Sequence, residues 1–510
     1  MAQVPILKLT DLFRTWTLLT LTMRHMNKNS NLAHLNKEKP TIMHIDLNSC
    51  FATIEQQANR LLRGRPVAVS AYDTPKGMVL ASSYEAKSLG VKLGVNNAEA
   101  RQMAPGIVIL TPDPSKYREA HRRFREVLLE FTPEVAPKSI DEFVLDFSGS
   151  PSLRKHDGNT PTSYVLRPMP SYDAHCARME EIGREIKQRI REHLGEWVTV
   201  NIGIGTNRFL AKYAAGFGKP DGMTLIDHRN LEELLTTDPY KHKPMELIDL
   251  PGINTRYAAR LMACGIKNPL EFLRADQLLL KKTVFKSVVG YYWWARLRGH
   301  EVDNRTFSTK SIGHQYALPK KTDDKKELAR LYMKLCEKVG RRLRKNNFCA
   351  RGIHLYMGFE RGAIKPVDSP IGFENMHLLR SWHEGHRLGY RLYTTSEIFE
   401  AMKVLLSRAE IPSRVTIIAI TVYDLEPWDP EQLSIFDYHE SRVDSCESRN
   451  NHKKSVAITE YRSQEAKKRL SDALDSINSR YGEFVITPGN MIDMHGEILD
   501  RIAFGSTTLD

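Results

Sequence analysis

The chain has 510 residues, which predicts about three to four domains, and its 41% hydrophobic and 26% charged residues are typical of a folded globular protein. With 74 lysines and arginines against 61 aspartates and glutamates, the formal net charge is +13, which favours a polyanionic partner without identifying one. No run approaches the roughly 18 apolar residues of a membrane-spanning helix, so we expect no membrane insertion.

Residues 1–39 are expected to form an N-terminal extension. Their apolar stretch, Leu18–Leu21, follows charged residues and precedes no small-residue cleavage site, so a secretory signal is not expected. The six cysteines contain no Cys-x-x-Cys pair, and a chain of this length needs no disulfide framework. These features favour a reducing cytoplasm and argue against a zinc site.

Strand and helix patterns alternate from residue 41 to residue 230, which predicts an α/β domain. Residues 149–172 are rich in serine, proline and charge, and we expect a loop there. The expected strands are Thr41–Leu47, Pro66–Ser70, Gly77–Ser83, Phe143–Phe147 and Val198–Ile204, and the expected helices are Tyr84–Leu89, Lys116–Phe131 and Cys176–Leu194.

Residues 231–300 have helical patterns, and a second α/β unit follows them. Residues 437–454 are polar and uneven, which indicates a linker. The second unit's expected strands are Phe307–Leu318, Gly352–Phe359, Arg387–Tyr393 and Arg414–Leu425, its expected helices are Lys325–Arg344 and Ser396–Ser407, and a last helix is expected over about Ser463–Arg480.

Three acidic residues lie at the ends of expected strands. Asp46 ends the first strand, and Asp141 and Glu142 stand just before another. Adjacent strand residues point to opposite faces, so Asp141 and Glu142 can converge only at an irregular strand end or through the length of the Glu side chain. Three such carboxylates would bind Mg²⁺, and two ions about 4 Å apart would stabilise both oxygens of a phosphoryl transfer. Taken singly, an acid here is more often a solvated strand-edge residue.

Two further segments contain glycines or cations in informative places. Ala81–Gly94 alone predicts a polar helix start with a stripe of core residues. The Gly203-Ile204-Gly205 segment lacks the third glycine of a dinucleotide-binding fingerprint, which excludes that function. Lys219 lies in a turn held by Pro220 and Gly222, where its ammonium could meet a phosphate.

Taken in order, these motifs resemble those of the bacterial Y-family, or translesion, DNA polymerases. His44–Ala52 resembles that family's opening palm motif, Tyr84–Lys87 its fingers motif, and Ser139–Phe143 its Ser-Ile-Asp-Glu motif. The resemblance extends over about residues 41–427.

The resemblance implies a multidomain α/β fold of the right-hand polymerase type, with palm, fingers, helical thumb and an α/β little finger. The implied division gives the extension residues 1–39, the palm 40–65 and 111–230, the fingers 66–110, the thumb 231–302, the little finger 306–427, and a clamp-binding peptide, linker and C-terminal helix 428–510.

The resemblance also implies roles for individual residues. Asp46, Asp141 and Glu142 become catalytic ligands of two Mg²⁺ ions, with the carbonyl of Leu47 assisting. Phe51 becomes an aromatic steric gate under the sugar, where a ribose 2′-OH would clash. The implied contacts of the dNTP triphosphate are Tyr84, Lys87 and Lys219.

The sequence departs from the family's pattern at several positions. Lys87 stands where many relatives carry arginine. A guanidinium that can make two parallel hydrogen bonds is thus replaced by an ammonium, which acts as a compact point charge. Asn48 replaces an aspartate that is common two residues after the first ligand, which lowers the local negative charge. Met78 and Leu80 are bulkier than the residues some relatives place near the nascent base pair, which puts lesion tolerance in doubt.

Two regions are candidates for DNA contact. Leu250–Ile253 resembles a helix-hairpin-helix turn, in which the backbone N–H groups of Gly252 and Ile253 would hold a phosphate, although an ordinary helical hairpin is the alternative. In the little finger, cations would make salt-dependent contacts with the DNA backbone, although such a run is more often a solvated face. These candidates are Lys310, Lys320, Lys321, Arg341, Arg342 and Arg344.

A short segment after the last expected strand of the second unit resembles the pentapeptide by which bacterial polymerases bind the sliding clamp. An extended glutamine anchor with three apolar side chains can fill a preformed apolar pocket. A buried strand end is the alternative, but the flanking prolines and aspartates favour an exposed segment. The candidate clamp-binding residues are Gln432, Leu433, Ile435 and Phe436.

The sequence therefore predicts a cytoplasmic, monomeric, error-prone DNA polymerase without proofreading. Its expected partners are primer-template DNA, dNTPs and the bacterial sliding clamp. One alternative is a catalytically weak, clamp-binding adaptor of the same fold, which should lack the acids. A nucleotidyl cyclase is another, but it would not need the helix-hairpin-helix, the little finger or the clamp peptide.

Overall fold

The computed structural model describes residues 34–150, 153, 171–305, 308–360, 381–428, 466–482 and 485–491. The chain divides into two compact units, residues 1–305 with 501–510 and residues 306–500. Within the described ranges, no helix has the length and apolar character needed to cross a membrane.

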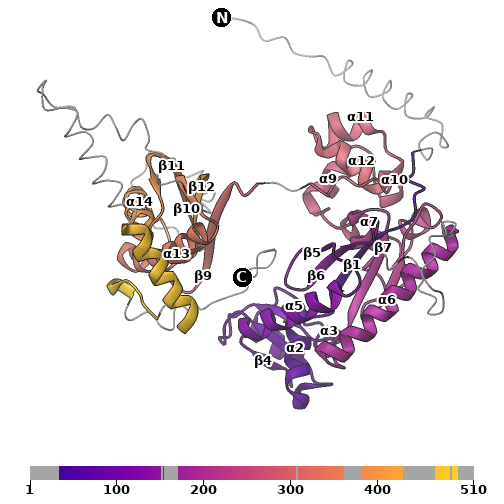
Figure 1. Ribbon diagram of the computed structural model, residues 1–510, viewed down its shortest axis with the longest axis horizontal. Helices are drawn as coiled ribbons and strands as arrows, with labels where there is room; N and C mark the ends of the chain where they lie inside the picture. The colour runs from indigo at the N-terminus through magenta and orange to yellow at the C-terminus, as the bar shows by residue number, and fades with distance from the viewer. Residues whose placement is uncertain are drawn as a thin grey trace, which may run out of the picture. The chain divides into compact units, whose positions relative to one another are not determined.

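The first unit is built around a five-stranded sheet in the order β5-β6-β1-β7-β8, of which β5, β6, β1 and β7 are labelled in Figure 1. The central strand β1 pairs antiparallel with both β6 and β7, and β7 pairs parallel with β8. The strands are β1 (Ile42–Leu47), β5 (Val135–Pro137), β6 (Glu142–Asp146), β7 (Val200–Gly205) and β8 (Met223–Leu225).

The two faces of this sheet carry different residues because side chains alternate along a strand. Met43 and Ile45 of β1 are fully buried in a core that they share with the long helices α5 (Pro114–Leu129) and α6 (Tyr172–Leu194). The short helix α7 (Arg208–Ala214) lies against β7 and β1, where its Ala211 joins Ile42 in a small apolar cluster. His44 and Asp46 share the parity of Ile42, so they lie on the α7 side of the sheet.

A smaller, three-stranded sheet in the order β3-β2-β4 follows helix α2. β2 pairs antiparallel with β3 and parallel with β4. The elements of this region are α2 (Cys50–Ala58), the 3₁₀ turn Arg60–Leu62, β2 (Val67–Ser70), β3 (Val79–Ser82), α3 (Tyr84–Ser88), α4 (Asn97–Met103) and β4 (Val108–Leu110).

Residues 231–300 form a helical region with its own core, in which Phe272, Phe285 and Trp293 pack together. Its elements are α8 (Leu231–Leu234), a 3₁₀ turn at Leu247–Asp249, α9 (Thr255–Ala263), α10 (Pro269–Arg274), α11 (Gln277–Leu279), a π-helical turn at Leu280–Val284 and α12 (Val289–Leu297).

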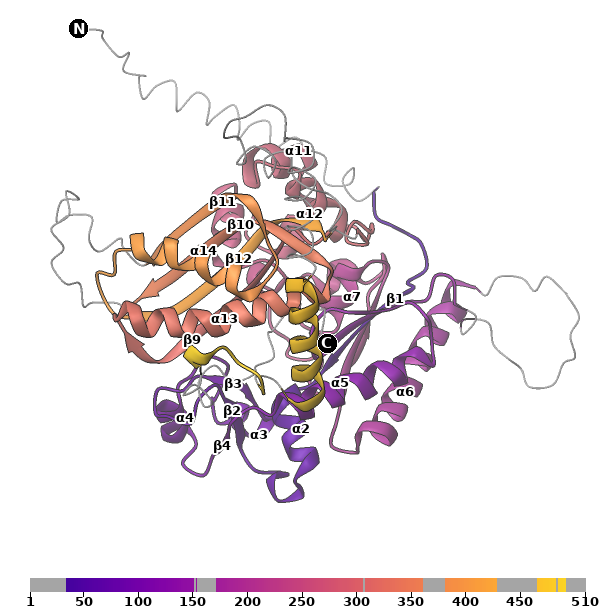
Figure 2. The same cartoon turned by 60° about the vertical axis from the view of Figure 1, so that its left-hand side comes forward.

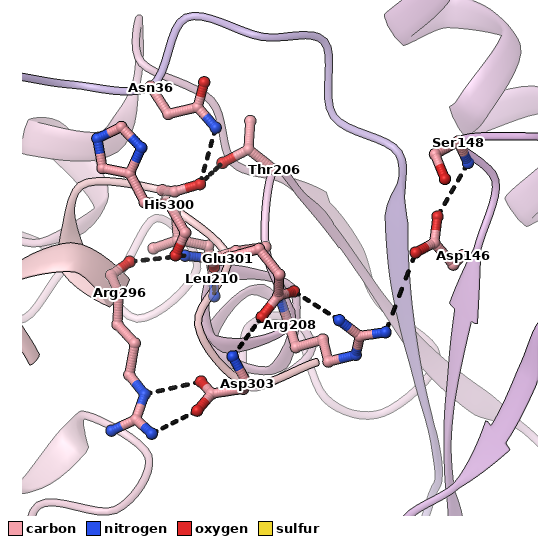
Figure 3. Close-up of polar contacts among 12 residues, drawn as sticks. Asn36, Asp146, Ser148, Thr206, Arg208, Leu210, Arg296, His300, Glu301 and Asp303 are labelled. Atoms are coloured by element: carbon pink, nitrogen blue, oxygen red, sulfur yellow. Dashed lines mark hydrogen bonds and ion pairs between the residues drawn. The ribbon is translucent and has the colours of Figure 1, made fainter. Parts of the chain in front are cut away.

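A polar junction fastens the end of α12 to the turn before α7 (Figure 3). The amide of Asn207 donates to the carbonyls of Arg296 and His300, at 2.9 Å each. Arg208 pairs with Glu301 at 2.9 Å, and its guanidinium lies 4.0 Å from Asp146 of β6. Residues 296–301 are therefore tied to the five-stranded sheet by side chains of the α7 turn.

The second unit is an antiparallel sheet in the order β11-β10-β12-β9, with α13 and α14 packed against it (Figure 2). Residues 466–481 form a further helix. Arg344 of α13 binds Asp475 of that helix through two hydrogen bonds of 2.6 and 2.9 Å. The elements are β9 (Ser311–Thr322), α13 (Lys325–Lys345), β10 (Phe348–Phe359), β11 (Ser381–Leu392), α14 (Thr395–Arg408), β12 (Val415–Pro427) and a 3₁₀ turn at Gly489–Met491.

Each strand and helix expected from the sequence has a counterpart in the structure, with its ends shifted by a few residues. The strands β4, β5 and β8 and the helices α2, α4 and α7 were not expected from the sequence. Most of the loop expected over residues 149–172 and all of the linker at 437–454 lie outside the described residues.

Candidate active site

The three acids predicted as catalytic line one cavity of about 290 Å³. Asp46 stands opposite Glu142 in the β1–β6 register, and Asp141 precedes β6 by one residue. That position outside the strand allows two consecutive acids to face the same cavity. The cavity is lined by Asp46, Leu47, Ser49, Cys50, Phe51, Leu80, Ala81, Ser82, Lys87, Leu93, Asp141, Glu142 and Lys219.

Each carboxylate already has a polar partner. Lys219 forms an ion pair with Asp46. The hydroxyl of Ser139 lies 2.5 Å from Asp141, and Lys212 binds both oxygens of Glu142 at 2.7 and 3.0 Å. No role for Ser139 or Lys212 was expected from the sequence.

The protonation of the acids reflects their crowding. Burial raises the pKa of Asp141, and repulsion by Asp46 and Glu142 raises it further, although the Ser139 hydrogen bond opposes this. Burial also acts to raise the pKa of Glu142, but His44 and Lys212 outweigh it and hold the value at about 2. Glu142 is therefore a carboxylate at neutral pH, and the cavity is a place where positive charge is favoured.

The donor chemistry of this cavity fits a divalent cation, since hard cations prefer carboxylate and carbonyl oxygens. Asp46, Asp141 and Glu142 supply carboxylates at one place, and Leu47 also lines it. Among the described residues, however, no group of three His, Cys, Asp or Glu side chains is close enough to hold a metal ion. The lysines on Asp46 and Glu142 do not use up these carboxylates, because each carboxylate oxygen has two lone pairs and can also bind a metal.

The predicted triphosphate contacts meet at the same end of the sheet. Lys87 and Lys219 both line the cavity, and burial together with the charge of Lys219 lowers the pKa of Lys87. Lys87 donates to the hydroxyl of Ser49 at 2.6 Å and lies 4.6 Å from the centre of the Tyr84 ring. Tyr84 is not among the lining residues and donates instead to Asn48 at 3.2 Å. Two cations thus face the cavity, with Tyr84 behind one of them.

Asn48, one of the departures from the family pattern, is a structural residue here. Its side chain is buried, accepts from Tyr84 and donates to Thr199 at 3.1 Å. An amide can donate and accept at once, whereas a carboxylate could only accept. Asn48 therefore links Tyr84 of α3 to Thr199, the residue that precedes β7.

The predicted steric gate, Phe51, lines the cavity from α2 and is 3% exposed. Its ring stacks on Tyr117 of α5, with centroids 4.3 Å apart. The Tyr117 hydroxyl donates to the buried Glu55 at 2.9 Å, and Lys116 pairs with Glu55 at 2.7 Å. The gate is thus supported from behind by residues that no sequence motif had singled out.

The small sheet supplies the apolar wall of the cavity. Leu80 lies in this wall, and Leu93 joins it from a turn. Met78 is 45% exposed and is not among the lining residues. Of the two bulky residues noted in the sequence, only Leu80 therefore faces the cavity.

The predicted DNA-contacting turn has the expected backbone shape. Gly252 has φ +86°, a conformation that favours glycine. Ile253 is buried, and its N–H donates to the carbonyl of Leu250 at 3.0 Å. Ile253 thus shapes the turn in this structure, and its N–H is already used within it.

The predicted cations of the second unit differ in their surroundings. Lys310 is exposed. Arg341 donates to Ser479 of the C-terminal helix at 2.9 Å, and Arg342 donates to the carbonyl of Gly313 at 2.9 Å. The predicted clamp-binding residues Gln432, Leu433, Ile435 and Phe436 lie outside the described residues.

Comparisons with known proteins agree with this architecture. The model of the impB/mucB/samB family matches residues 45–216, and the model of that family's C-terminal domain matches residues 309–435. The chain is 31% identical over 454 residues to a DNA polymerase IV of Moorella thermoacetica, covering 88% of this chain and 94% of that relative. It is 27% identical over 400 residues to a DNA polymerase IV of Staphylococcus aureus strain MRSA252, covering 78% of this chain and 98% of that relative.

A solved structure of a Y-family DNA polymerase chimera superposes with a TM-score of 0.58 at 22% sequence identity. The match covers 75% of this chain and 98% of the chimera. The likeness shows that the chain has the Y-family polymerase fold, with mixed α/β domains.

Proposed function

Because the chain belongs to the impB/mucB/samB family and is a DNA-directed DNA polymerase of the Y-family, translesion class, we propose that it adds dNTPs to a primer 3′ end opposite damaged template bases by two-metal-ion phosphoryl transfer. The observation that carries this proposal is the single cavity that holds Asp46, Asp141 and Glu142 together with Lys87 and Lys219. Acids for metal and cations for phosphate at one place are what nucleotidyl transfer requires.

In the proposed reaction the primer 3′-OH attacks the α-phosphorus of a dNTP, and pyrophosphate leaves. Asp46, Asp141 and Glu142, with the Leu47 carbonyl, would hold the ions. When bound, two Mg²⁺ ions would stabilise the attacking and leaving oxygens. Lys87 and Lys219 would attract the triphosphate by charge.

Choice of sugar is assigned to Phe51. Its stacking on Tyr117 fixes the ring, so the ring cannot move aside to admit a 2′-OH without breaking that contact. This rigidity favours deoxyribose through steric exclusion rather than through a hydrogen bond.

Several finer features belong to the same proposal. We expect no proofreading, a cytoplasmic and monomeric enzyme, and recruitment to the sliding clamp through Gln432–Phe436. The adaptor alternative predicts missing acids, yet all three acids are present and face one cavity.

The direct test is primer extension on undamaged and lesion-bearing templates. Asp141→Ala and Glu142→Ala should abolish extension on both templates while leaving DNA affinity nearly unchanged, because DNA affinity comes mainly from cations elsewhere. Near-normal extension by either variant would refute the site assignment. A wild-type enzyme that stops at every lesion tested would refute the translesion role.

A further inference from the structure

The Gly203-Ile204-Gly205 segment, which lacks the third glycine of a dinucleotide-binding fingerprint, lets α7 lie directly on the catalytic strands. A Cβ atom at Gly203 would lie 1.9 Å from the carbonyl oxygen of Ala211, and one at Gly205 would lie 2.8 Å from the Ala211 nitrogen. Both distances are too short for real atoms, so only glycine permits this approach. The β7 glycines therefore set the height of α7 above the sheet.

Lys212 follows Ala211 on this lowered helix and reaches the catalytic Glu142. Its ammonium donates to Oε2 at 2.7 Å and to Oε1 at 3.0 Å, so it holds both oxygens at once. The helix that carries it is anchored one turn earlier. There, Arg208 binds Glu301 and lies near Asp146 at the other end of β6 (Figure 3). The position of the Lys212 backbone is thus fixed by contacts on two sides.

His44 approaches the same carboxylate from within the sheet. It stands opposite Gly203 in the β1–β7 register, and its side chain is 3% exposed. Its Nε2 lies 3.8 Å from Oε1 of Glu142, and neither ring nitrogen has a hydrogen-bond partner within the described residues. Buried polar atoms nearly always have a partner, so the nearby carboxylate is the evident group for this ring to serve.

We propose that Lys212 and His44 are positioning residues for Glu142. They fix the orientation of this carboxylate at the cavity wall, and the glycine pair of β7 makes the arrangement possible. The inference rests on the proposed function, because it takes Glu142 as a catalytic ligand. Neither residue lines the cavity, so neither is assigned contact with the dNTP.

The test compares Lys212→Met with Lys212→Arg in the full-length protein. The matched control is Arg189→Met, because Arg189 also pairs with a glutamate at 2.8 Å and is similarly exposed (40% against 44%), but lies on α6 away from the cavity. Groups that orient metal ligands typically change metal affinity or activity about 10- to 100-fold when removed. We therefore expect Lys212→Met to lower the maximal rate of single-nucleotide insertion by about 10-fold or more.

Three further readouts separate positioning from a general structural effect. The dNTP KM and the DNA Kd should stay within about twofold of wild type, because Lys87, Lys219 and the DNA-contacting surfaces are unchanged. Mn²⁺ binding to the complex of enzyme, DNA and a non-hydrolysable dNTP analogue, followed by electron paramagnetic resonance, should weaken by about 10-fold or more. Lys212→Arg should restore much of both losses, since its guanidinium can also bind both oxygens.

The outcomes are distinct. Wild-type insertion rate and Mn²⁺ affinity in Lys212→Met would overturn the inference, as would an equal loss in Arg189→Met. If Asp141→Ala is inactive while Lys212→Met is normal, only the positioning role fails, whereas an active Asp141→Ala refutes the proposed function itself. Lys212→Gln serves the same comparison if the methionine variant does not fold. His44→Phe, which keeps an aromatic ring but removes both ring nitrogens, should show the same pattern in the rate and in Mn²⁺ affinity.

Discussion

Replacing Asp475 with alanine should release the C-terminal helix, residues 466–481, from the second unit. Asp475 is the bidentate partner of Arg344, whose side chain is 4% exposed and whose guanidinium also donates to the carbonyl of Tyr393 at 3.3 Å. Without Asp475 a guanidinium would stay buried with its main charge partner gone. The protein can avoid this only by letting the helix move away and water reach Arg344.

The size of the effect follows mainly from the burial of Arg344, since the Asp475 side chain is 18% exposed and the lower end of the usual range applies. Removing one partner of a buried ion pair costs about 3–5 kcal/mol. If the docked helix loses about 3 kcal/mol, its opening equilibrium shifts by roughly 100-fold. The exposed pair between Lys467 and Glu397, 3.1 Å long, provides the control. Lys467→Ala should cost at most about 1 kcal/mol, or about fivefold.

Hydrogen exchange followed by mass spectrometry measures this directly. Peptides covering residues 466–482 should exchange roughly 100-fold faster in Asp475→Ala and at most about fivefold faster in Lys467→Ala. Peptides from the five-stranded sheet of the first unit should be unaffected by either change. Equal exchange in wild type and Asp475→Ala would show that the ion pair does not hold the helix, and the reasoning from burial would fail.

Three further predictions concern function and stability. Phe51→Ala should raise the efficiency of ribonucleotide insertion relative to deoxyribonucleotide insertion by at least about tenfold, because removing a clash worth about 1.4 kcal/mol changes this ratio tenfold. Single-nucleotide insertion assays measure the ratio, and unchanged discrimination would remove Phe51 from the gate role. The same variant should unfold at a lower temperature, because truncating a buried phenylalanine typically costs about 3–5 kcal/mol. Replacing both Leu433 and Phe436 with alanine should leave basal extension of a short primer unchanged but abolish stimulation by the loaded sliding clamp, since each lost anchor costs about 2 kcal/mol of binding free energy. Extension of a primed circular template with and without the clamp measures this stimulation. Normal stimulation of the double variant would place the clamp contact elsewhere.

The longer elements could be predicted because their residue patterns repeat. The apolar steps of three and four in α6 and the alternation in β7 each extend over enough residues to show a period. The three-residue strands β4, β5 and β8 are too short to show one. Helix α4 had a readable signal in the pair Asn96 and Glu99, which forms a capping box, but only two of its residues are buried.

One boundary error has a clear physical cause. The residue pattern predicted that a strand ends at Leu318, before Pro319, whereas β9 continues to Thr322. Proline cannot donate to a sheet ladder, but β9 lies at the edge of its sheet and tolerates one. Whether a strand lies at the edge or in the middle of its sheet depends on the tertiary fold, and the local residue pattern does not reveal it.

Residues of the candidate site could be predicted only where they belong to a recognisable sequence motif. Asp46, Asp141 and Glu142 were identified by type and order. Lys212 and Tyr117 were not, because their roles depend on which helix packs against which strand. The nearest sequence signal was the glycine pair of β7, whose absent side chains indicate a close approach by another backbone without naming the helix that makes it.

The polar junction at Asn207 also bears on how such polymerases can be recombined. Residues 296–301 belong by their contacts to the five-stranded sheet, because Asn207 and Arg208 hold their carbonyls and Glu301. A crossover placed inside α12 would leave the Asn207 amide facing a foreign backbone, whereas one placed after Arg305 would transfer the second unit whole. Natural or engineered hybrids of this chain should therefore tolerate a crossover after Arg305, whereas a crossover inside α12 should destabilise them.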